Sequence, residues 1–436
     1  MDQNLTLNDL SQLVEGDAVA IRGRAVLEPA GGPDDKVFPP SHSVSDNDKR
    51  AGAKYAFEMR RRDGNDIKCV LLDSVQSQAN RMEEALQALW SDKKLTLPVI
   101  EVDLSEVAPD VGKVTSLTAP HRVADALFRD SLIDEEDEKK LFRSSTLGKS
   151  FADASPRNAG PLFKVCPTGL VFGIWDSTGP KGGLGAKFQR VLTSEIVGIG
   201  AAAGMKTASR IDPAQMVNAA ATIYRRKRES GAILTWTLDP GEAELSEKNE
   251  PLKWGAKKKD GKWVQGEGKL TTANHSNIPP TLDDLAGGVT IDHAEHTVVL
   301  SLAALRRLGF TESDLKARVV LAALGLVAIL ATESRGHDLR SRCLLVPRWN
   351  EKDKEKNSQA LTLEVVARDG STKPLTLDLE AALALYEEAV RSLPQSLKFE
   401  KPAGEPLATL KPSPKLTHLI AKSRELAAAG ADIGDE

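Results

Sequence analysis

The sequence predicts an α+β fold. Strand and helix signals alternate irregularly along the 436 residues, with hairpins and long insertions between them; a doubly wound sheet would alternate regularly. The apolar run at residues 67–74 precedes helical spacing from Ala79 to Leu89, with Ser74 as a helix-capping residue. Asp369–Gly370 lies between β-rich flanks, which is a hairpin signal. A chain of this length predicts either two domains or one domain with large insertions.

The first third of the chain contains two expected insertions. Residues 17–29 alternate as an opening strand, and a Pro-, Gly-, Ser- and Asp-rich surface loop is expected over about residues 29–60. Residues 97–107 predict another strand. Helical spacing at residues 118–144 predicts a helical insertion over about residues 105–165.

The rest of the chain gives stronger signals. Residues 168–179 predict a strand because they are β-branched and aromatic, whereas residues 190–200 fit either a strand or a short helix. Residues 319–331 predict a buried helix too short to span a bilayer. An amphipathic helix is expected to end at Pro394. The Lys- and Pro-rich tail, residues 395–436, is expected to be loose.

Composition restricts the function. The formal net charge of -4 requires any nucleic-acid surface to be a local basic patch. The three cysteines lie far apart without zinc or thiol-exchange spacing, which predicts a reducing cytoplasm. The first residues lack the pattern of a secretory signal. We therefore expect a cytoplasmic protein with no membrane role and no cofactor.

A glycine-rich segment at residues 175–190 is the main candidate site. Its glycines let backbone N–H groups converge on an anion, and its cations have no acidic residue between them. Phosphate is the predicted ligand, although a structural turn with exposed lysines is the alternative. The segment matches neither the nucleotide-hydrolase loop nor the dinucleotide-binding pattern. The candidate residues are Ser177, Thr178, Gly179, Lys181, Gly182, Gly183, Lys187 and Arg190.

Other basic residues carry two interpretations each. Lys206 and Arg210, close to Ser209, suit phosphate oxygens or a solvated loop equally. Arg22 and Arg24 share one face of the opening strand and could meet RNA there, or simply face solvent.

Two further segments are also ambiguous. His121 and Arg122 follow Pro120 at an expected helix start, where capping is favoured over phosphate binding. The Lys- and Gly-rich segment at about residues 240–280 predicts a basic hairpin. Two roles are open for its Lys257, Lys258 and Lys259. They are expected either to reach over RNA or target DNA or to form a solubilising loop. His293 and His296 are interpreted as surface histidines, so no metal site is expected.

The segment at residues 170–198, followed by residues 205–213, resembles the signature of the type I-G (formerly I-U) CRISPR backbone subunit. This subunit is a divergent member of the Cas-seven family in the RAMP superfamily. Residues 71–83 and 287–308 are similar to other blocks of that family. The resemblance extends in scattered blocks from Asp17 to Pro394, and it covers neither the Lys-rich hairpin nor the tail.

The resemblance implies an RRM-like (ferredoxin-like) palm over residues 1–394 with large helical and hairpin insertions. It also implies a non-catalytic, multi-copy subunit that binds the crRNA backbone. Its partners would be crRNA, target DNA through the guide, further copies of itself in a filament, a large subunit and an RNA-processing and capping subunit. Sequence-tolerant phosphate contacts suit a guide whose spacer varies. The alternatives are a metal-dependent ribonuclease using Asp176 and a phosphate-ligand enzyme using the glycine-rich segment.

Overall fold

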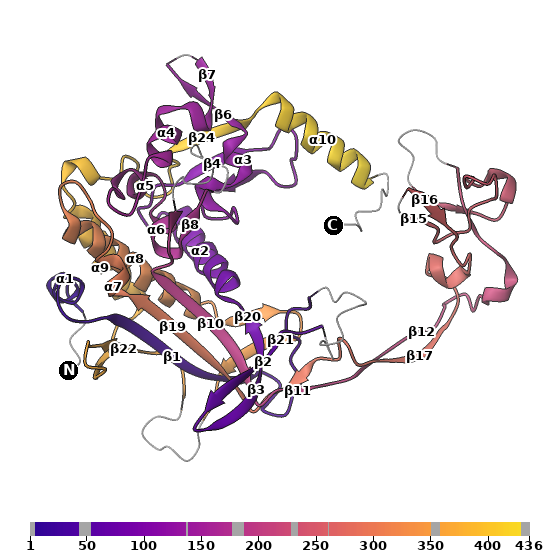
Figure 1. Ribbon diagram of the computed structural model, residues 1–436, viewed down its shortest axis with the longest axis horizontal. Helices are drawn as coiled ribbons and strands as arrows, with labels where there is room; N and C mark the ends of the chain where they lie inside the picture. The colour runs from indigo at the N-terminus through magenta and orange to yellow at the C-terminus, as the bar shows by residue number, and fades with distance from the viewer. Residues whose placement is uncertain are drawn as a thin grey trace. The chain divides into compact units, whose positions relative to one another are not determined.

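The computed structural model describes residues 5–42, 54–136, 138–176, 187–227, 234–259, 261–349 and 358–428. The chain divides into two compact units. Unit 1 comprises Met1–Gly204 and Gly288–Leu416, and unit 2 comprises Met205–Gly287 and Thr417–Glu436. Helices and predominantly antiparallel sheets are mixed throughout unit 1 (Figure 1), which confirms the predicted α+β class. The RRM-like palm stays an expectation.

A large antiparallel sheet forms the centre of unit 1. Its main path runs β2-β3-β10-β19-β1-β21-β20, and β22 pairs with both β1 and β23. The predicted opening strand and the hairpin at Asp369–Gly370 are both confirmed. The strands are β1 (Ala20–Pro29), β2 (Phe57–Arg62), β3 (Asn65–Asp73), β10 (Leu192–Ile199), β19 (His293–Ser301), β20 (His337–Arg340), β21 (Cys343–Pro347), β22 (Thr362–Val366) and β23 (Thr372–Leu375).

The two faces of this sheet differ because side chains alternate along each strand. In β19, Ala294, Val298 and Leu300 are buried, while Thr297 is exposed. Helices cover the buried face, with α2 (Val75–Ser91) against β10 and α8 (Asp314–Glu333) against β19 (Figure 1). Arg24 of β1 is paired in register with Thr297, so it lies on the opposite, polar face.

Helices α2, α8 and α9 (Leu379–Arg391) agree with the sequence prediction, whereas α1 (Leu7–Glu15) was not predicted. Ser74 caps α2 by accepting a hydrogen bond from the Ser77 amide at 3.2 Å. Helix α8 has the length and composition of a membrane span, but 78% of its most apolar window is buried inside the protein. It therefore serves as the core helix of unit 1. The helices are α1 (Leu7–Glu15), α2 (Val75–Ser91), α7 (Leu302–Leu305), α8 (Asp314–Glu333) and α9 (Leu379–Arg391).

A second sheet in unit 1 has the order β5-β4-β24-β6-β7. Its central strand β24 comes from the tail, where Leu410 is fully buried, so the expectation of a loose tail is wrong for residues 408–412. The β6–β7 hairpin lies where helical spacing predicted a helix; β6 instead pairs with β24. The elements are β4 (Ile100–Asp103), β5 (Lys113–Thr115), α3 (Ala126–Arg129), β6 (Ser131–Glu135), β7 (Glu138–Leu141), α4 (Thr146–Ala152), α5 (Gly160–Val165) and β24 (Ala408–Pro412). Helix α10 (Pro414–Ala428) follows β24, and from Thr417 onward it belongs to unit 2.

The strand predicted at residues 168–179 is largely wrong. Pro167–Phe172 forms helix α6, and only Ile174–Trp175 is a strand, β8, which pairs with β9 (Lys187–Phe188). Every residue of α6 is buried, and a short apolar run that is buried on all sides has no periodicity to separate helix from strand. Gly173 ends the helix with a φ of 82°, a conformation that glycine adopts freely.

Unit 2 consists of short two-stranded ribbons around a few buried side chains, among them Ile223, Leu252 and Leu270. Within the segment predicted as a basic hairpin, the structure confirms a short one: Lys257–Lys259 (β15) pairs with Lys262–Val264 (β16), and all three lysines of β15 are exposed. Its contact with RNA or DNA stays a prediction. The other strands are β12 (Lys206–Arg210), β17 (Ile278–Asp283), β13 (Tyr224–Arg225) and β14 (Trp236–Thr237), whereas β11 (Ala202–Ala203) and β18 (Val289–Thr290) belong to unit 1.

Candidate nucleic-acid interface

A cleft of about 750 Å³ opens on unit 1. Its walls come from the start of α2, from residues 120–129, from the end of α6 with β8, and from β9. The lining includes four Lys or Arg residues and one acid, so its formal charge is positive. The lining residues are Gln76, Ala79, Asn80, Pro120, His121, Arg122, Ala124, Ala126, Arg129, Phe172, Gly173, Ile174, Trp175, Asp176, Lys187, Phe188, Gln189 and Arg190.

Both ends of the glycine-rich segment lie on the wall of this cleft. Strands β8 and β9 are paired, with Trp175 opposite Lys187, so the two described ends of the segment lie side by side in the cleft wall. Residues 177–186 lie outside the described residues. The predicted roles of Ser177, Thr178, Gly179, Lys181, Gly182 and Gly183 therefore stay predictions.

Lys187 and Arg190 are the cations that the cleft leaves available. Lys187 Nζ lies 5.3 Å from the centroid of the Trp175 ring, whose side chain is 58% exposed. Arg190 passes close to Gly173, where an added Cβ would lie 3.0 Å from Arg190 Cγ. Within the described part of the chain, neither cation has a carboxylate partner. Among the described residues, no carboxylate therefore has to be displaced before these two charges meet an anionic ligand.

Arg122 holds the cleft wall together. It is buried and donates two hydrogen bonds of 2.7 Å to the carboxylate of Glu83 and one of 2.9 Å to the Gly173 carbonyl. Burial raises the pKa of the Glu83 carboxyl to about 7, while the Arg122 guanidinium opposes that rise. Arg122 thus ties α2 to the backbone that leads into β8. A direct contact with RNA stays a prediction.

The helix start expected at Pro120 is a three-residue 3-10 turn, Arg122–Ala124. His121 precedes it, and its side chain makes no capping hydrogen bond. So short a turn has little of the dipole that attracts a phosphate to a helix N-terminus. His121 is exposed on the cleft wall and can reach a ligand only through its own side chain.

Asp176, the residue of the ribonuclease alternative, is already engaged. Its side chain is buried, and both of its carboxylate oxygens accept hydrogen bonds from Arg143, at 2.9 and 2.8 Å. A metal ion could use Asp176 only after this pair had broken. The acid of the cleft lining is therefore neutralised by the protein itself.

The polar face of the main sheet adjoins the cleft. A smaller pocket of about 230 Å³ on this face includes Val75, whereas Gln76 lines the cleft, so the two meet at the start of α2. The prediction that Arg22 and Arg24 share a face is confirmed. Arg22 is paired with Glu364 at 2.6 Å.

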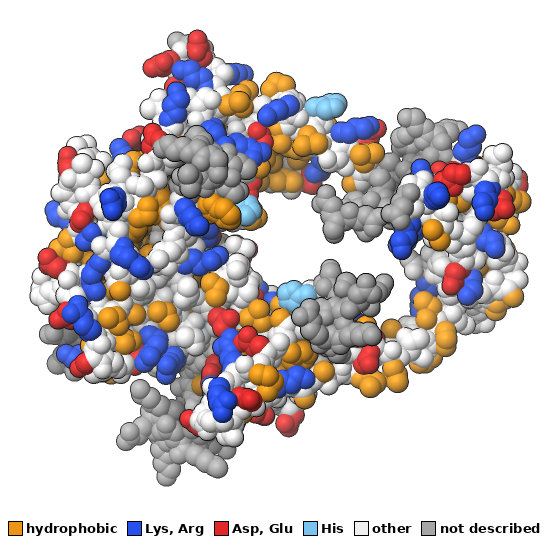
Figure 2. Space-filling model, in the orientation of Figure 1, with side chains coloured by type: hydrophobic (Ala, Val, Ile, Leu, Met, Phe, Trp, Pro, Cys, Tyr) orange, Lys and Arg blue, Asp and Glu red, His pale blue; other side chains and the backbone are white. Residues whose placement is uncertain are grey.

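Acidic side chains offset most of the arginines on this face. Arg60 binds Glu195 at 2.8 Å, and Arg62 binds both oxygens of Glu295 at 2.6 Å. Figure 2 shows Lys and Arg side chains interspersed with Asp and Glu over the visible face of unit 1. Positive charge on this face (Figure 2) is therefore local, which agrees with the net charge of -4.

The second predicted basic cluster lies in unit 2, on the β12–β17 ribbon. Lys206 forms an ion pair of 3.2 Å with Asp283. Arg210 donates to the Ser276 carbonyl at 2.6 Å and lies 3.9 Å from Asp212. These cations already have partners on their own ribbon, and a contact of Lys206, Ser209 or Arg210 with RNA stays a prediction.

Sequence reasoning missed several polar and aromatic residues of the cleft. Trp175 was assigned to a long strand, although its pairing with Lys187 places it on the rim as an exposed ring. Gln76 and Asn80 lie one helical turn apart at the start of α2. The capping Ser74 was the sequence signal that marked this helix start.

A protein-family model matches part of this chain. This match supports a CRISPR-associated protein with a role in CRISPR defence. The matching family model is described as CRISPR-associated protein GSU0053 (Cas_GSU0053), and it covers residues 21–203, which is less than half of the chain. All lining residues of the cleft fall within this range, whereas α8 falls outside it. A comparison with curated proteins found no match.

Proposed function

We propose that the chain is a multi-copy backbone subunit of a type I-G CRISPR surveillance (Cascade-like) complex. In this role it binds the sugar-phosphate backbone of crRNA and presents the guide for base pairing with target DNA. The observation that carries the proposal is the cleft of unit 1, where Lys187 and Arg190 are available to an anion while Asp176 is held by Arg143.

The cleft chemistry suits a ligand whose sequence varies. Lysine and arginine bind phosphates without reading bases, and binding through them depends strongly on salt. The exposed ring of Trp175 adds a stacking surface, which tolerates any base because every base has a π-face. The described ends of the glycine-rich segment, at β8 and β9, lie beside these groups, and we propose that its amide donors serve the same ligand. A guide-holding subunit needs this combination.

The remaining parts of the proposal rest on the resemblance of the sequence together with the family match. The RRM-like palm belongs to them, as do the filament of copies and the partnership with a large subunit and an RNA-processing and capping subunit. We assign the chain a non-catalytic role in the cytoplasm. The guide supplies sequence specificity by base pairing, so the protein needs only to hold its backbone.

Copurification tests this proposal. The chain is expressed together with a CRISPR array and its neighbouring effector genes, purified through a tag on another subunit, and its RNA is sequenced. We expect RNA of uniform length that carries spacer sequence, in complexes with several copies of this chain. The Lys187→Glu/Arg190→Glu variant should recover less RNA. Complexes that contain the chain but no spacer RNA would contradict the proposal.

A further inference from the structure

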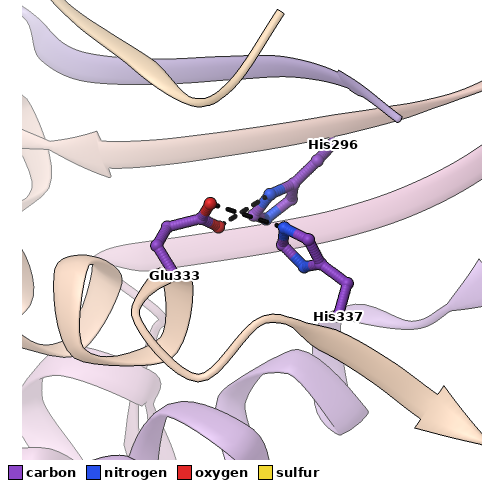
Figure 3. Close-up of side chains that lie close together, drawn as sticks. All are labelled: His296, Glu333 and His337. Carbon is purple, nitrogen blue, oxygen red and sulfur yellow. Dashed lines mark ion pairs between the residues drawn. The ribbon is translucent and has the colours of Figure 1, made fainter. Parts of the chain in front are cut away.

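Two histidines and a glutamate meet in the core of unit 1, away from the residues that line the cleft. His296 comes from β19, Glu333 from the last turn of α8 and His337 from β20 (Figure 3). His296 is 1% exposed and His337 5%. Each imidazole faces one oxygen of the carboxylate, with His296 Nδ1 3.2 Å from Oε1 and His337 Nε2 3.4 Å from Oε2.

A hydrogen-bond chain that starts at Asp73 decides which ring nitrogen of His296 carries the hydrogen. Asp73 is fully buried and pairs with Arg81 at 2.9 Å and with Arg340 at 3.1 Å. Both arginines donate to this carboxylate, so its oxygens act as hydrogen-bond acceptors. Gln78 Nε2 donates to Asp73 at 2.6 Å, and this contact fixes the orientation of the Gln78 amide.

The chain continues in one direction. With its nitrogen toward Asp73, Gln78 presents Oε1 to the Ser194 hydroxyl, which donates to it at 2.7 Å. The hydroxyl has one hydrogen, so it must accept from His296 Nε2 at 2.8 Å. His296 therefore carries its proton on Nε2, and its Nδ1 lone pair faces Glu333.

Two acceptors then face each other in the core. His296 Nδ1 and Glu333 Oε1 are both buried and have no hydrogen-bond partner among the described residues. Leaving such groups unsatisfied is costly, so something positive must lie between them. The candidates are an extra proton, which would make an ion pair, and a metal ion.

The geometry points to a metal. In a tetrahedral zinc site with bonds of about 2.0–2.1 Å, neighbouring ligand atoms are separated by about 3.3 Å. Here the two imidazoles lie 3.2 and 3.4 Å from the carboxylate, each facing a different oxygen, and the three ligand atoms lie within 4.8 Å of one another, close enough to share one ion. Two imidazoles and one carboxylate are also a common ligand set for zinc. The hydrogen bond from the other ring nitrogen of His296 to Ser194 fixes the orientation of the ring, as such second hydrogen bonds do at metal sites.

We propose that His296, Glu333 and His337 bind a divalent transition-metal ion, with Zn²⁺ the best chemical fit. The ion would bind Nδ1 of His296, Nε2 of His337 and the Glu333 carboxylate, and water would complete the tetrahedron. Because the three ligands come from β19, α8 and β20, the ion fastens the end of the core helix to two strands of the main sheet. Its role is structural and is independent of RNA binding.

Metal content of the untagged full-length chain tests this site. Protein purified from zinc-supplemented medium is dialysed and analysed by inductively coupled plasma mass spectrometry. We expect about one zinc per chain, and a rise in Tm when zinc is returned to chelator-treated protein. Zinc well below stoichiometry together with an unchanged Tm would overturn the proposal and leave a proton between the two acceptors.

Variants locate the ion. His337→Gln should weaken zinc binding by at least about 100-fold, and Ser194→Ala by about 10-fold through the loss of orientation at His296. His293→Gln is the matched control, since His293 lies on the opposite face of β19 and contacts Glu295. Equal zinc binding by His337→Gln and the control would overturn the assignment.

Cobalt substitution keeps the test independent of how the variants fold. Co²⁺ added to the metal-free wild-type chain should give the intense visible absorption of tetrahedral coordination by nitrogen and oxygen, and zinc should abolish it. An octahedral spectrum, or none, would overturn the proposed geometry.

Discussion

Reversing two charges in the cleft should weaken RNA binding by a calculable amount. Lys187→Glu/Arg190→Glu removes the two lining cations for which the described residues supply no carboxylate partner. If each contacts one phosphate of a single strand, the slope of log K against log salt should become shallower by about 1.4. Over the decade from about 1 M to about 0.1 M salt, this slope corresponds to about 25-fold in affinity, or about 2 kcal/mol.

Fluorescence polarisation with labelled single-stranded RNA, repeated over a salt series, measures both the affinity and the slope. Lys373→Glu/Lys398→Glu is a matched control, because it makes the same change in charge at exposed positions outside the cleft. The control should lose little affinity and keep the wild-type slope. Equal losses and equal slopes in the two variants would refute the assignment of the cleft, because only the overall charge would then matter.

Four further outcomes are expected. Trp175→Ala should weaken RNA binding by about 1–3 kcal/mol without changing the salt slope, because stacking is lost and no charge is; polarisation titrations check this. Arg122→Ala should lower the free energy of unfolding by about 3–5 kcal/mol, since it leaves the buried Glu83 carboxylate unpaired, as measured by denaturant unfolding. Burial raises the pKa of the Glu83 carboxyl to about 7. The protonated carboxyl therefore adds its full contribution to the free energy of unfolding below pH 4.5, and this contribution is lost as the pH rises through about 7. Relative to Glu83→Gln, the wild type should therefore lose roughly 3 kcal/mol across that window; a constant difference in unfolding free energy would contradict this. Leu410→Ala should cost about 2–5 kcal/mol because Leu410 is fully buried in the second sheet, whereas a loose tail would show no change in Tm.

Patterns in the local sequence predicted the strands and helices that have one clear signal of their own, such as alternation, a cap or an apolar run. Alternation predicted β1, the cap at Ser74 predicted the start of α2, and apolar length predicted α8. The same reasoning failed at Pro167–Phe172, where burial on all sides removes the periodicity. It failed again at β24, whose strand conformation comes from pairing with β4 and β6, which lie far away in sequence.

The sequence predicted which residue types of the candidate site could bind an anion, but it predicted only part of how these residues are arranged in space. The sequence indicated that Lys187, Arg190 and His121 could meet a phosphate, and the fold brings all three to one cleft. It could not show that Arg122 is bound by Glu83, because the two lie 39 positions apart in sequence and meet only through packing.

The buried cluster was missed for a similar reason. His296 was interpreted as a surface residue, yet it faces the helix layer because the buried face of β19 includes it. Glu333 and His337 reach it from α8 and β20, which are separated from β19 in the sequence. No spacing in the sequence links the three.

Photocrosslinking of crRNA in the assembled complex tests the central claim most directly. Guide RNA that contains 4-thiouridine is irradiated in the complex, and the crosslinked peptides are identified by mass spectrometry. Crosslinks should fall on the peptides that carry Trp175, Lys187 and Arg190. If they occurred only in other parts of the chain, such as the Lys257–Lys259 hairpin, the cleft would not be where this protein holds RNA.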